Sequence, residues 1–345
     1  MTAVPVLVTA LAVRSAAPDL LGAVYAGRPA FTPVNRFRPV GRDTPVAATR
    51  PGAPDLADQL VEVLAEAGAG RSPVLLALHG DERAGPVAAR VAERFGVAPQ
   101  LYTGACVAAA TAVADGAALI EAGRAERVVV AAGYLVEPDT FALFDAGRAL
   151  SRSGAVRPFS RGRDGLLLGD AVVALVLEAG RAGGPSGLAR LAGWGRAGDG
   201  HHVCRPDPGG AGLARAVRAA LQRAGVADEQ VGWVNANGTG SPIGDAAEAA
   251  ALALAFGERA ARLPVSSTKA VHGHALEASA LLELAVTIGV LGEGKIPVNA
   301  GWLGPDEQCP LDVVVAAPRT LGAPYLLTVN SAFGGANTAL LVGAP

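Results

Sequence analysis

The chain has 345 residues, 51% of them hydrophobic, so it is long enough to bury a large core in one large domain or two ordinary ones. Only 17% of the residues are charged and the formal net charge is −2, which leaves no basic excess to neutralise nucleic-acid phosphates. Composition therefore excludes intrinsic disorder and argues against a nucleic-acid partner.

The cysteines and the apolar segments bear on the compartment. Cys106, Cys204 and Cys309 lie far apart and form no CxxC pair, which argues against a disulfide framework or a zinc site and is typical of a reducing compartment. The apolar start at residues 4–13 lacks a preceding basic segment, and no apolar run reaches about 18 residues. We therefore expect a soluble, cytoplasmic protein without a membrane segment, in which at least one thiol serves chemistry.

In the first half of the chain, short β-branched runs alternate with Ala- and Leu-rich stretches. This alternation predicts an α/β fold with a parallel or mixed sheet covered by helices. The predicted strands span residues 4–9, 74–78, 127–132 and 171–178, and the predicted helices span 55–67, 85–95 and 106–122.

The same rhythm restarts after residues 180–187 (GRAGGPSG), which form the best candidate for a boundary. Two halves of similar length and rhythm predict a duplicated α/β unit, with an N-terminal half at 1–182 and a C-terminal half at 183–345, although no close internal sequence repeat is present. The second half has predicted strands at 188–194, 231–236, 313–316 and 325–330, and predicted helices at 211–224, 245–255 and 275–291.

Two motifs in the second half have weak functional support. Residues 193–198 match GxGxxG, a pattern of dinucleotide-binding turns, but residues 199–210 are too rich in Gly and Pro to form the helix that must receive the pyrophosphate. His201, His202 and Cys204 are metal-ligating residue types, yet no second ligand pair lies nearby. We therefore favour an irregular loop over either site.

Cys106 opens a strongly helical stretch after a short turn at residues 102–105. The aligned dipoles and free N–H groups of a helix N-terminus stabilise a thiolate, so this position predicts a lowered thiol pKa and a nucleophilic sulfur. The alternative is a small buried core cysteine, which is common in Ala-rich helices. The segment alone leaves both interpretations open.

Two polar segments follow apolar strands. Residues 234–245 (VNANGTGSPIGD) form a Gly-rich turn, and residues 267–283 carry Lys269 and His274 ahead of a helix. Both deliver hydrogen-bonding side chains from strand ends, where open α/β sheets bind their ligands. Taken singly, the Asn-Gly pair at 237–238 also fits a hairpin turn, and His272 or His274 also fits a helix cap.

Together with residues 157–178 (RPFSRGRDGLLLGDAVVALVLE) and 330–337 (NSAFGGAN), these segments resemble the β-ketoacyl synthases of fatty-acid and type II polyketide assembly. Five motifs occur in family order at family-like spacing from about residue 85 to residue 342. The resemblance implies the thiolase fold, in which two pseudo-symmetric α/β halves stack as α-β-α-β-α layers. It also implies a homodimer or a heterodimer.

The resemblance assigns the nucleophile and its loop. Cys106 matches the acyl-accepting nucleophile, and its backbone N–H together with that of Phe333 matches the oxyanion hole. Phe333 also matches the gating phenylalanine, and Gly334 and Gly335 give its loop conformational freedom.

The resemblance also assigns the polar residues around the nucleophile. His274 matches the second active-site histidine, Lys269 the lysine that organises the pocket, and Glu283 the carboxylate that follows the histidine. Asn237 stands where the first catalytic histidine is expected. An amide donates a hydrogen bond but does not carry a proton on and off near neutral pH, so this residue predicts impaired condensation.

Two further departures from the family concern the acyl pocket. Only 105 residues precede Cys106, fewer than the family pattern leads one to expect, and the missing part in relatives builds some of the dimer contact and acyl pocket. Glu277 replaces a glycine one turn after His274. A solvated helix face and a tuned site are equally compatible with this carboxylate.

The resemblance implies two functions. In the first, the protein transfers an acyl group from acyl carrier protein or acyl-coenzyme A to Cys106 and condenses it with malonyl carrier protein, without a metal or organic cofactor. In the second, it is a non-condensing partner subunit like the chain-length factors of ketosynthase heterodimers, although these typically lose the cysteine. An arginine cluster is expected to attract an acidic carrier protein and comprises Arg148, Arg152, Arg157, Arg161 and Arg163.

Overall fold

The computed structural model describes residues 4–38, 45–181, 183–184 and 186–345. Within these residues, two successive series of elements have the same order. In each series a helix follows every strand up to the last two strands, which pair antiparallel. The first run comprises β1 (Val6–Ser15), α2 (Leu56–Glu66), β4 (Val74–Ala77), α3 (Ala84–Phe95), β5 (Gln100–Tyr102), α4 (Ala108–Glu121), β6 (Arg127–Tyr134) and β7 (Ala171–Ala179). The second comprises β8 (Ala189–Gly198), α6 (Ala211–Ala224), β9 (Val231–Asn235), α7 (Pro242–Phe256), β10 (Pro264–Ser266), α9 (Ser279–Glu293), β14 (Tyr325–Ser331) and β15 (Ala336–Gly343).

Both runs pair their strands in the same way. In the first, β7 lies antiparallel between β1 and β6, and β6, β4 and β5 follow in parallel. In the second, β15 lies antiparallel between β8 and β14, and β14, β9 and β10 follow in parallel. A short antiparallel contact between β1 and β8 joins the two sheets into one strand order. The two halves are therefore pseudo-symmetric.

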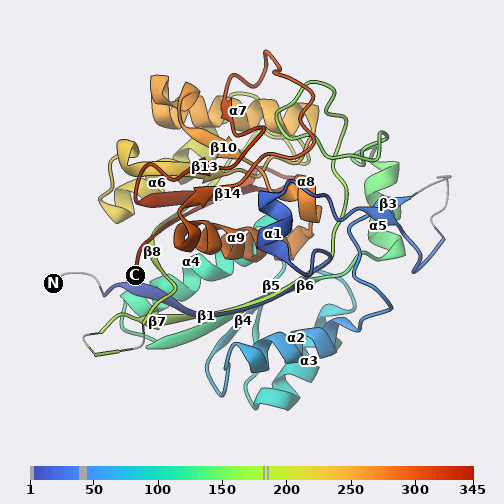
Figure 1. The fold of residues 1–345 in the computed structure, drawn as a ribbon. Coiled ribbons are helices and arrows are strands. Elements are labelled where there is room, and N and C mark those ends of the chain that lie inside the picture. The colour runs from blue at the N-terminus through green and yellow to red at the C-terminus, as the bar shows by residue number, and fades with distance from the viewer. Residues whose placement is uncertain (1–3, 39–44, 182, 185) are drawn as a thin grey trace.

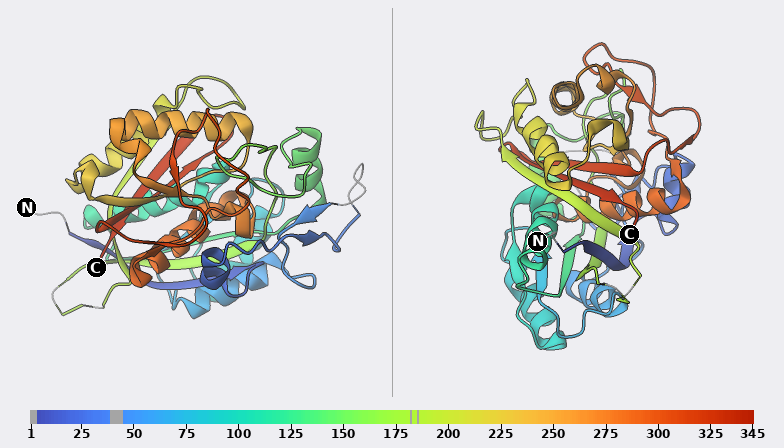
Figure 2. Two further views of the ribbon diagram at one scale, coloured as in Figure 1. Left: turned by 45° about the horizontal axis from the view of Figure 1, so that its top comes forward. Right: turned by 90° about the vertical axis from the view of Figure 1, so that its left-hand side faces the viewer.

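The layers follow from the helices. Helices α4 and α9 lie between the two sheets, α2 and α3 cover the outside of the first sheet, and α6 and α7 cover the outside of the second (Figures 1 and 2). Every residue of α9 from Ser279 to Ile288 is buried, as expected for a helix enclosed between two sheets. The α-β-α-β-α order implied by the resemblance is confirmed.

The glycines of the GxGxxG motif lie inside β8 and serve packing. A Cβ on Gly195 would lie 1.9 Å from the carbonyl oxygen of Ala216, and one on Gly193 would lie 2.2 Å from that of Ala220. These glycines therefore let α6 lie directly on the strand. His201, His202 and Cys204 are exposed in the irregular loop that follows β8, as the sequence predicts.

Shorter elements complete the chain. They are α1 (Leu20–Tyr25), β2 (Thr32–Pro33), β3 (Val46–Ala47), η1 (Ala105–Val107), α5 (Pro138–Ala146), η2 (Asp228–Gln230), η3 (Gly257–Ala261), α8 (Lys269–His272), η4 (Leu276–Ala278), β11 (Lys295–Ile296), β12 (Asp312–Val313) and β13 (Arg319–Thr320). The strand expected at 313–316 is thus only two residues long. The expected half boundary falls at residue 182, which lies outside the described residues. Within the described part of the chain, no helix is both long and apolar enough to cross a membrane.

Candidate active site

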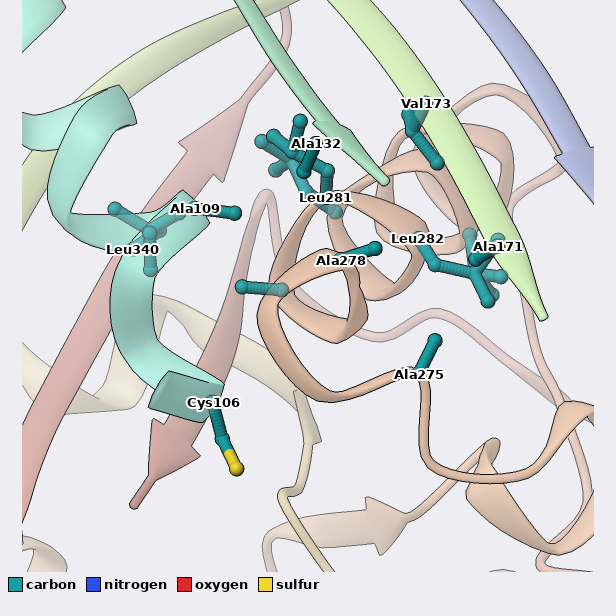
Figure 3. Close-up of a cluster of buried hydrophobic side chains, with 14 of the residues drawn as sticks. Cys106, Ala109, Ala132, Ala171, Val173, Ala275, Ala278, Leu281, Leu282 and Leu340 are labelled. Atoms are coloured by element: carbon teal, nitrogen blue, oxygen red, sulfur yellow. The ribbon is translucent and has the colours of Figure 1, made fainter. Parts of the chain in front are cut away.

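Cys106 lies in the 3-10 turn η1, which leads from the edge strand β5 into the central helix α4. The preceding residue, Ala105, has φ +52°, a left-handed conformation that residues other than glycine rarely adopt. The backbone therefore turns sharply just before the sulfur. Figure 3 shows the Cys106 side chain at the first turn of α4, at the end of a buried aliphatic cluster that includes Ala275 and Ala278.

The expectation of a lowered thiol pKa is wrong. Burial, followed by the negative charge of Glu277, raises the pKa of Cys106 to about 12, although the Lys269 ammonium acts in the opposite direction. The sulfur does lie at a helix N-terminus, but loss of hydration outweighs the stabilisation of a thiolate by the helix dipole. Cys106 therefore rests as a thiol at neutral pH and must lose its proton during attack.

His274 is held as a neutral hydrogen-bond donor. Its Nδ1 accepts the Leu276 backbone N–H at 3.1 Å and lies 2.8 Å from the Ser279 hydroxyl, which itself accepts the N–H of Ala275. Because Nδ1 accepts a hydrogen bond from a backbone N–H, the single N–H proton of the neutral imidazole is assigned to Nε2. Burial, followed by the charge of Lys269, lowers the pKa of His274 well below its ordinary value. The imidazole therefore offers an Nε2–H rather than a charge.

Asn237 follows β9 and has a fixed amide orientation. Its Oδ1 accepts a hydrogen bond from the Lys269 Nζ at 3.2 Å, so the amide NH₂ group remains as a donor. Its backbone N–H and that of Gly238 donate to the two carboxylate oxygens of Glu248 at 2.7 and 2.8 Å. The chain then enters α7, so the hairpin interpretation is wrong. Sequence reasoning missed Glu248, although its place in the first turns of α7 was a usable signal.

Lys269 and Glu283 form a buried ion pair, with side chains exposed by 1% and 0%. Burial raises the pKa of Glu283 while Lys269 lowers it, and the second carboxylate oxygen accepts the Asn330 side-chain N–H at 2.7 Å. The ammonium thus links the Glu283 carboxylate to the Asn237 amide. This pair orients the amide from behind the cavity.

A cavity of about 420 Å³ brings the predicted residues together. Cys106, Asn237, His274 and Phe333 all line it, although they come from η1, the loop after β9, the loop before α9 and the β14–β15 turn. Lys269 and Glu283 do not line it. The cavity therefore combines a thiol with an amide donor and an imidazole donor from both halves of the chain.

The Phe333 loop forms part of the wall of this cavity. Phe333 is 57% exposed, and its ring stacks on that of Phe144 with the ring centroids 6.0 Å apart. Gly334 and Gly335 have φ values of +92° and +77°, and a Cβ on Gly335 would lie 2.7 Å from the Cβ of Asp199. The turn therefore requires glycine at residue 335.

Glu277 is not on a solvated helix face. It is 2% exposed in η4, and its Oε1 lies 2.9 Å from the Nδ1 of His79, which follows β4. The hydrogen bond to Glu277 raises the pKa of His79. Sequence reasoning missed His79, for which the only signal was a polar residue just after a buried strand.

The predicted arginine cluster is only partly a surface patch. Arg163 is buried and pairs with Asp306 at 2.5 Å, so it is unavailable to a partner. Arg148 is exposed and lines the 420 Å³ cavity, and Arg152 and Arg161 are also exposed. Within the described residues, no group of three or more His, Cys, Asp or Glu side chains is placed to hold a metal ion.

Two family models match the chain. The β-ketoacyl synthase N-terminal domain matches residues 57–182, and the β-ketoacyl synthase C-terminal domain matches residues 188–302. The 3-oxoacyl-[acyl-carrier-protein] synthase 2 of Staphylococcus aureus is 34% identical over 247 residues, which cover 69% of this chain and 61% of that protein.

Similarity extends to polyketide proteins. The tetracenomycin polyketide synthase ketoacyl synthase alpha subunit of Streptomyces glaucescens is 36% identical over 249 residues, which cover 70% of this chain and 58% of that protein. The chain thus spans about three fifths of the length of the curated relatives it matches. A solved structure titled the ishigamide ketosynthase/chain length factor aligns with a TM-score of 0.89 at 25% identity, covering all of both chains.

Proposed function

Because the chain belongs to the β-ketoacyl synthase family, we propose that it transfers an acyl group from a thioester to Cys106 and condenses that group with a malonyl thioester. The observation that carries this proposal is the cavity in which the Cys106 thiol faces the space shared with the His274 and Asn237 donors. The similarity to a 3-oxoacyl-[acyl-carrier-protein] synthase and to a polyketide ketoacyl synthase subunit supports acyl thioesters as the substrate class.

In the first half-reaction, the Cys106 sulfur attacks the carbonyl carbon of the acyl thioester. A new S–C bond forms, the bond to the carrier sulfur breaks, and the thiol proton passes to the departing carrier thiol. The backbone N–H groups of Cys106 and Phe333 hold the oxyanion, and such a donor is typically worth about 3 to 4 kcal/mol. The product is an acyl-cysteine and a free carrier thiol.

In the second half-reaction, the malonyl thioester loses carbon dioxide and becomes an enolate. The His274 Nε2–H and the Asn237 amide donate to its oxygen, and its carbon attacks the acyl-Cys106 carbonyl. The S–C bond breaks, which releases a β-ketoacyl thioester and the Cys106 thiolate, and this thiolate takes a proton from water to restore the thiol. We expect condensation to be slow, because Asn237 supplies a donor but cannot move a proton.

The partners follow from this chemistry. An acyl carrier protein or coenzyme A delivers the acyl group, and exposed Arg148 at the cavity is placed to attract an acidic carrier. We expect the protein to act as a dimer, either with itself or with a ketosynthase.

A second candidate function is a non-condensing partner subunit. Asn237 favours the partner role because an amide that cannot carry a proton stands in the cavity where the family has a histidine. The similarity to the ishigamide ketosynthase/chain length factor agrees with this role. Coexpression with a ketosynthase separates the candidates. A stable one-to-one complex in which acyl transfer needs only the ketosynthase cysteine would support the partner role.

Asn237→His is expected to raise carbon dioxide release from malonyl carrier protein by about tenfold or more, because it restores an imidazole beside the enolate. Labelled carbon dioxide and β-ketoacyl product are measured together, with Asn237→Ala as the control that loses the donor and slows release. Unchanged release in folded Asn237→His would contradict the role of this position. Absence of both products from wild-type protein and Asn237→His would contradict the condensing function.

A further inference from the structure

A second cavity, of about 730 Å³, lies in the first half of the chain. It is bounded by α2, α3 and the ends of β4 and β6, and its lining combines apolar residues such as Leu56, Val87 and Leu135 with charged residues. His79 and Tyr134 also line it. Nothing in the reaction described above uses this space.

The turn that carries Glu277 contacts both the turn of the nucleophile and a strand that borders this cavity. The turn η4 packs against η1, which carries Cys106, and against β6, whose last residue, Tyr134, lines the cavity. From η4 the Glu277 carboxylate reaches His79 on the cavity wall at 2.9 Å. Glu277 therefore lies in a turn that contacts the Cys106 turn, and His79 joins it to the wall of the 730 Å³ cavity.

This boundary is polar and buried. The Glu277 side chain is 3% exposed, and its Oε2 has no hydrogen-bond partner among the described residues. An alkyl chain threaded past this side chain would strip the carboxylate of any water without offering it a hydrogen bond, which is costly.

We propose that Glu277 and His79 form a polar gate that closes the 730 Å³ cavity to alkyl chains and restricts Cys106 to short acyl groups. The functional half of this inference rests on the proposed acyl transfer. The gate itself is a property of the passage and is testable without that activity.

Alkyl methanethiosulfonates probe the passage directly. The Cys106 thiolate attacks the alkyl-bearing sulfur, a disulfide forms and methanesulfinate leaves, so no acyl transfer is needed. The protein carries Cys204→Ala to remove the exposed thiol, and peptide mass spectrometry follows Cys106 at pH 9. The readout is the ratio of the decyl to the methyl labelling rate, because losing the Glu277 charge accelerates both reagents by lowering the thiol pKa.

Glu277→Gly is expected to raise this ratio at least about tenfold over the parent protein, while Glu277→Gln, which keeps the size and polarity, leaves it within about twofold. His79→Ala, which does not alter η4, is expected to raise the ratio as well. A decyl-to-methyl ratio near one in the Cys204→Ala parent protein would overturn the gate. The same ratio in Glu277→Gly and His79→Ala as in that parent would overturn it as well.

Acyl-coenzyme A of increasing chain length then tests the functional half on the same variants. The parent is expected to take acetyl but not decanoyl groups, and Glu277→Gly is expected to take both. Equal acceptance of both chains by the parent would overturn the chain-length role. Failure of every variant to form any acyl adduct would instead contradict the proposed function, while the labelling ratio still decides the gate.

Discussion

Lys269→Met is expected to lower the free energy of unfolding by about 3 to 5 kcal/mol, because it leaves the Glu283 carboxylate buried without its cation. Glu283 is fully buried, and burial already raises its pKa above the ordinary value. Removing Lys269 also removes the hydrogen bond to the Asn237 side chain. The methionine fills similar space, so the loss reports the missing charge rather than a cavity.

Urea denaturation measures this loss, and the double variant Lys269→Met/Glu283→Gln is the control. Removing both charges is expected to recover at least half of the stability, since an absent buried pair costs far less than a broken one. In Lys269→Met the folded-state pKa of Glu283 rises further. The variant is therefore destabilised least at pH values below the unfolded-state pKa of Glu283, where the carboxyl is protonated in both states, and it loses stability as the pH rises. A loss of unfolding free energy below about 1 kcal/mol at pH 8 would contradict this account. A loss at pH 4 as large as the loss at pH 8 would contradict it as well.

Alkylation of Cys106 by iodoacetamide is expected to accelerate about tenfold for each pH unit between pH 7 and pH 9. The reagent reacts with the thiolate, and burial raises the pKa of this thiol to about 12. Far below the pKa, the thiolate fraction grows in proportion to hydroxide concentration. The total acceleration over the two pH units is therefore about one hundredfold.

The alternative is a resting thiolate paired with a protonated His274. That pair would make the alkylation rate nearly independent of pH between 6 and 8. Burial and Lys269 lower the pKa of His274, which disfavours the protonated form. Peptide-resolved mass spectrometry in a Cys204→Ala protein separates the outcomes, and a plateau in this range would show that the neutral thiol and neutral imidazole are assigned wrongly.

Local patterns predicted much of the fold. The helix expected at 211–224 coincides with α6, because its apolar face repeats at helical spacing and Gly225 ends it in a left-handed conformation. The strands expected at 74–78 and 171–178 lie within one residue of β4 and β7 at each end, because both are short and fully apolar at their centres. β15 was missed, since only four consecutive apolar residues, 339–342, follow its polar start at Asn337 and Thr338.

The site was predictable in its membership but not in its electrostatics. The motifs indicated that Cys106, Asn237 and His274 gather, and the cavity confirms that they do. The direction of the thiol pKa depends on how completely η4 and its neighbours exclude water, which no single segment encodes. The contact between His79 and Glu277 joins residues 198 positions apart and follows only from the packing of the two halves.

The mass of the intact protein after incubation with acetyl-coenzyme A or acetyl carrier protein tests acyl transfer most directly. The account predicts one acetyl adduct that Cys106→Ala abolishes and Cys204→Ala retains, with peptide mapping to Cys106. The absence of an adduct, or an adduct that persists in folded Cys106→Ala, would contradict the claim that this sulfur accepts the acyl group.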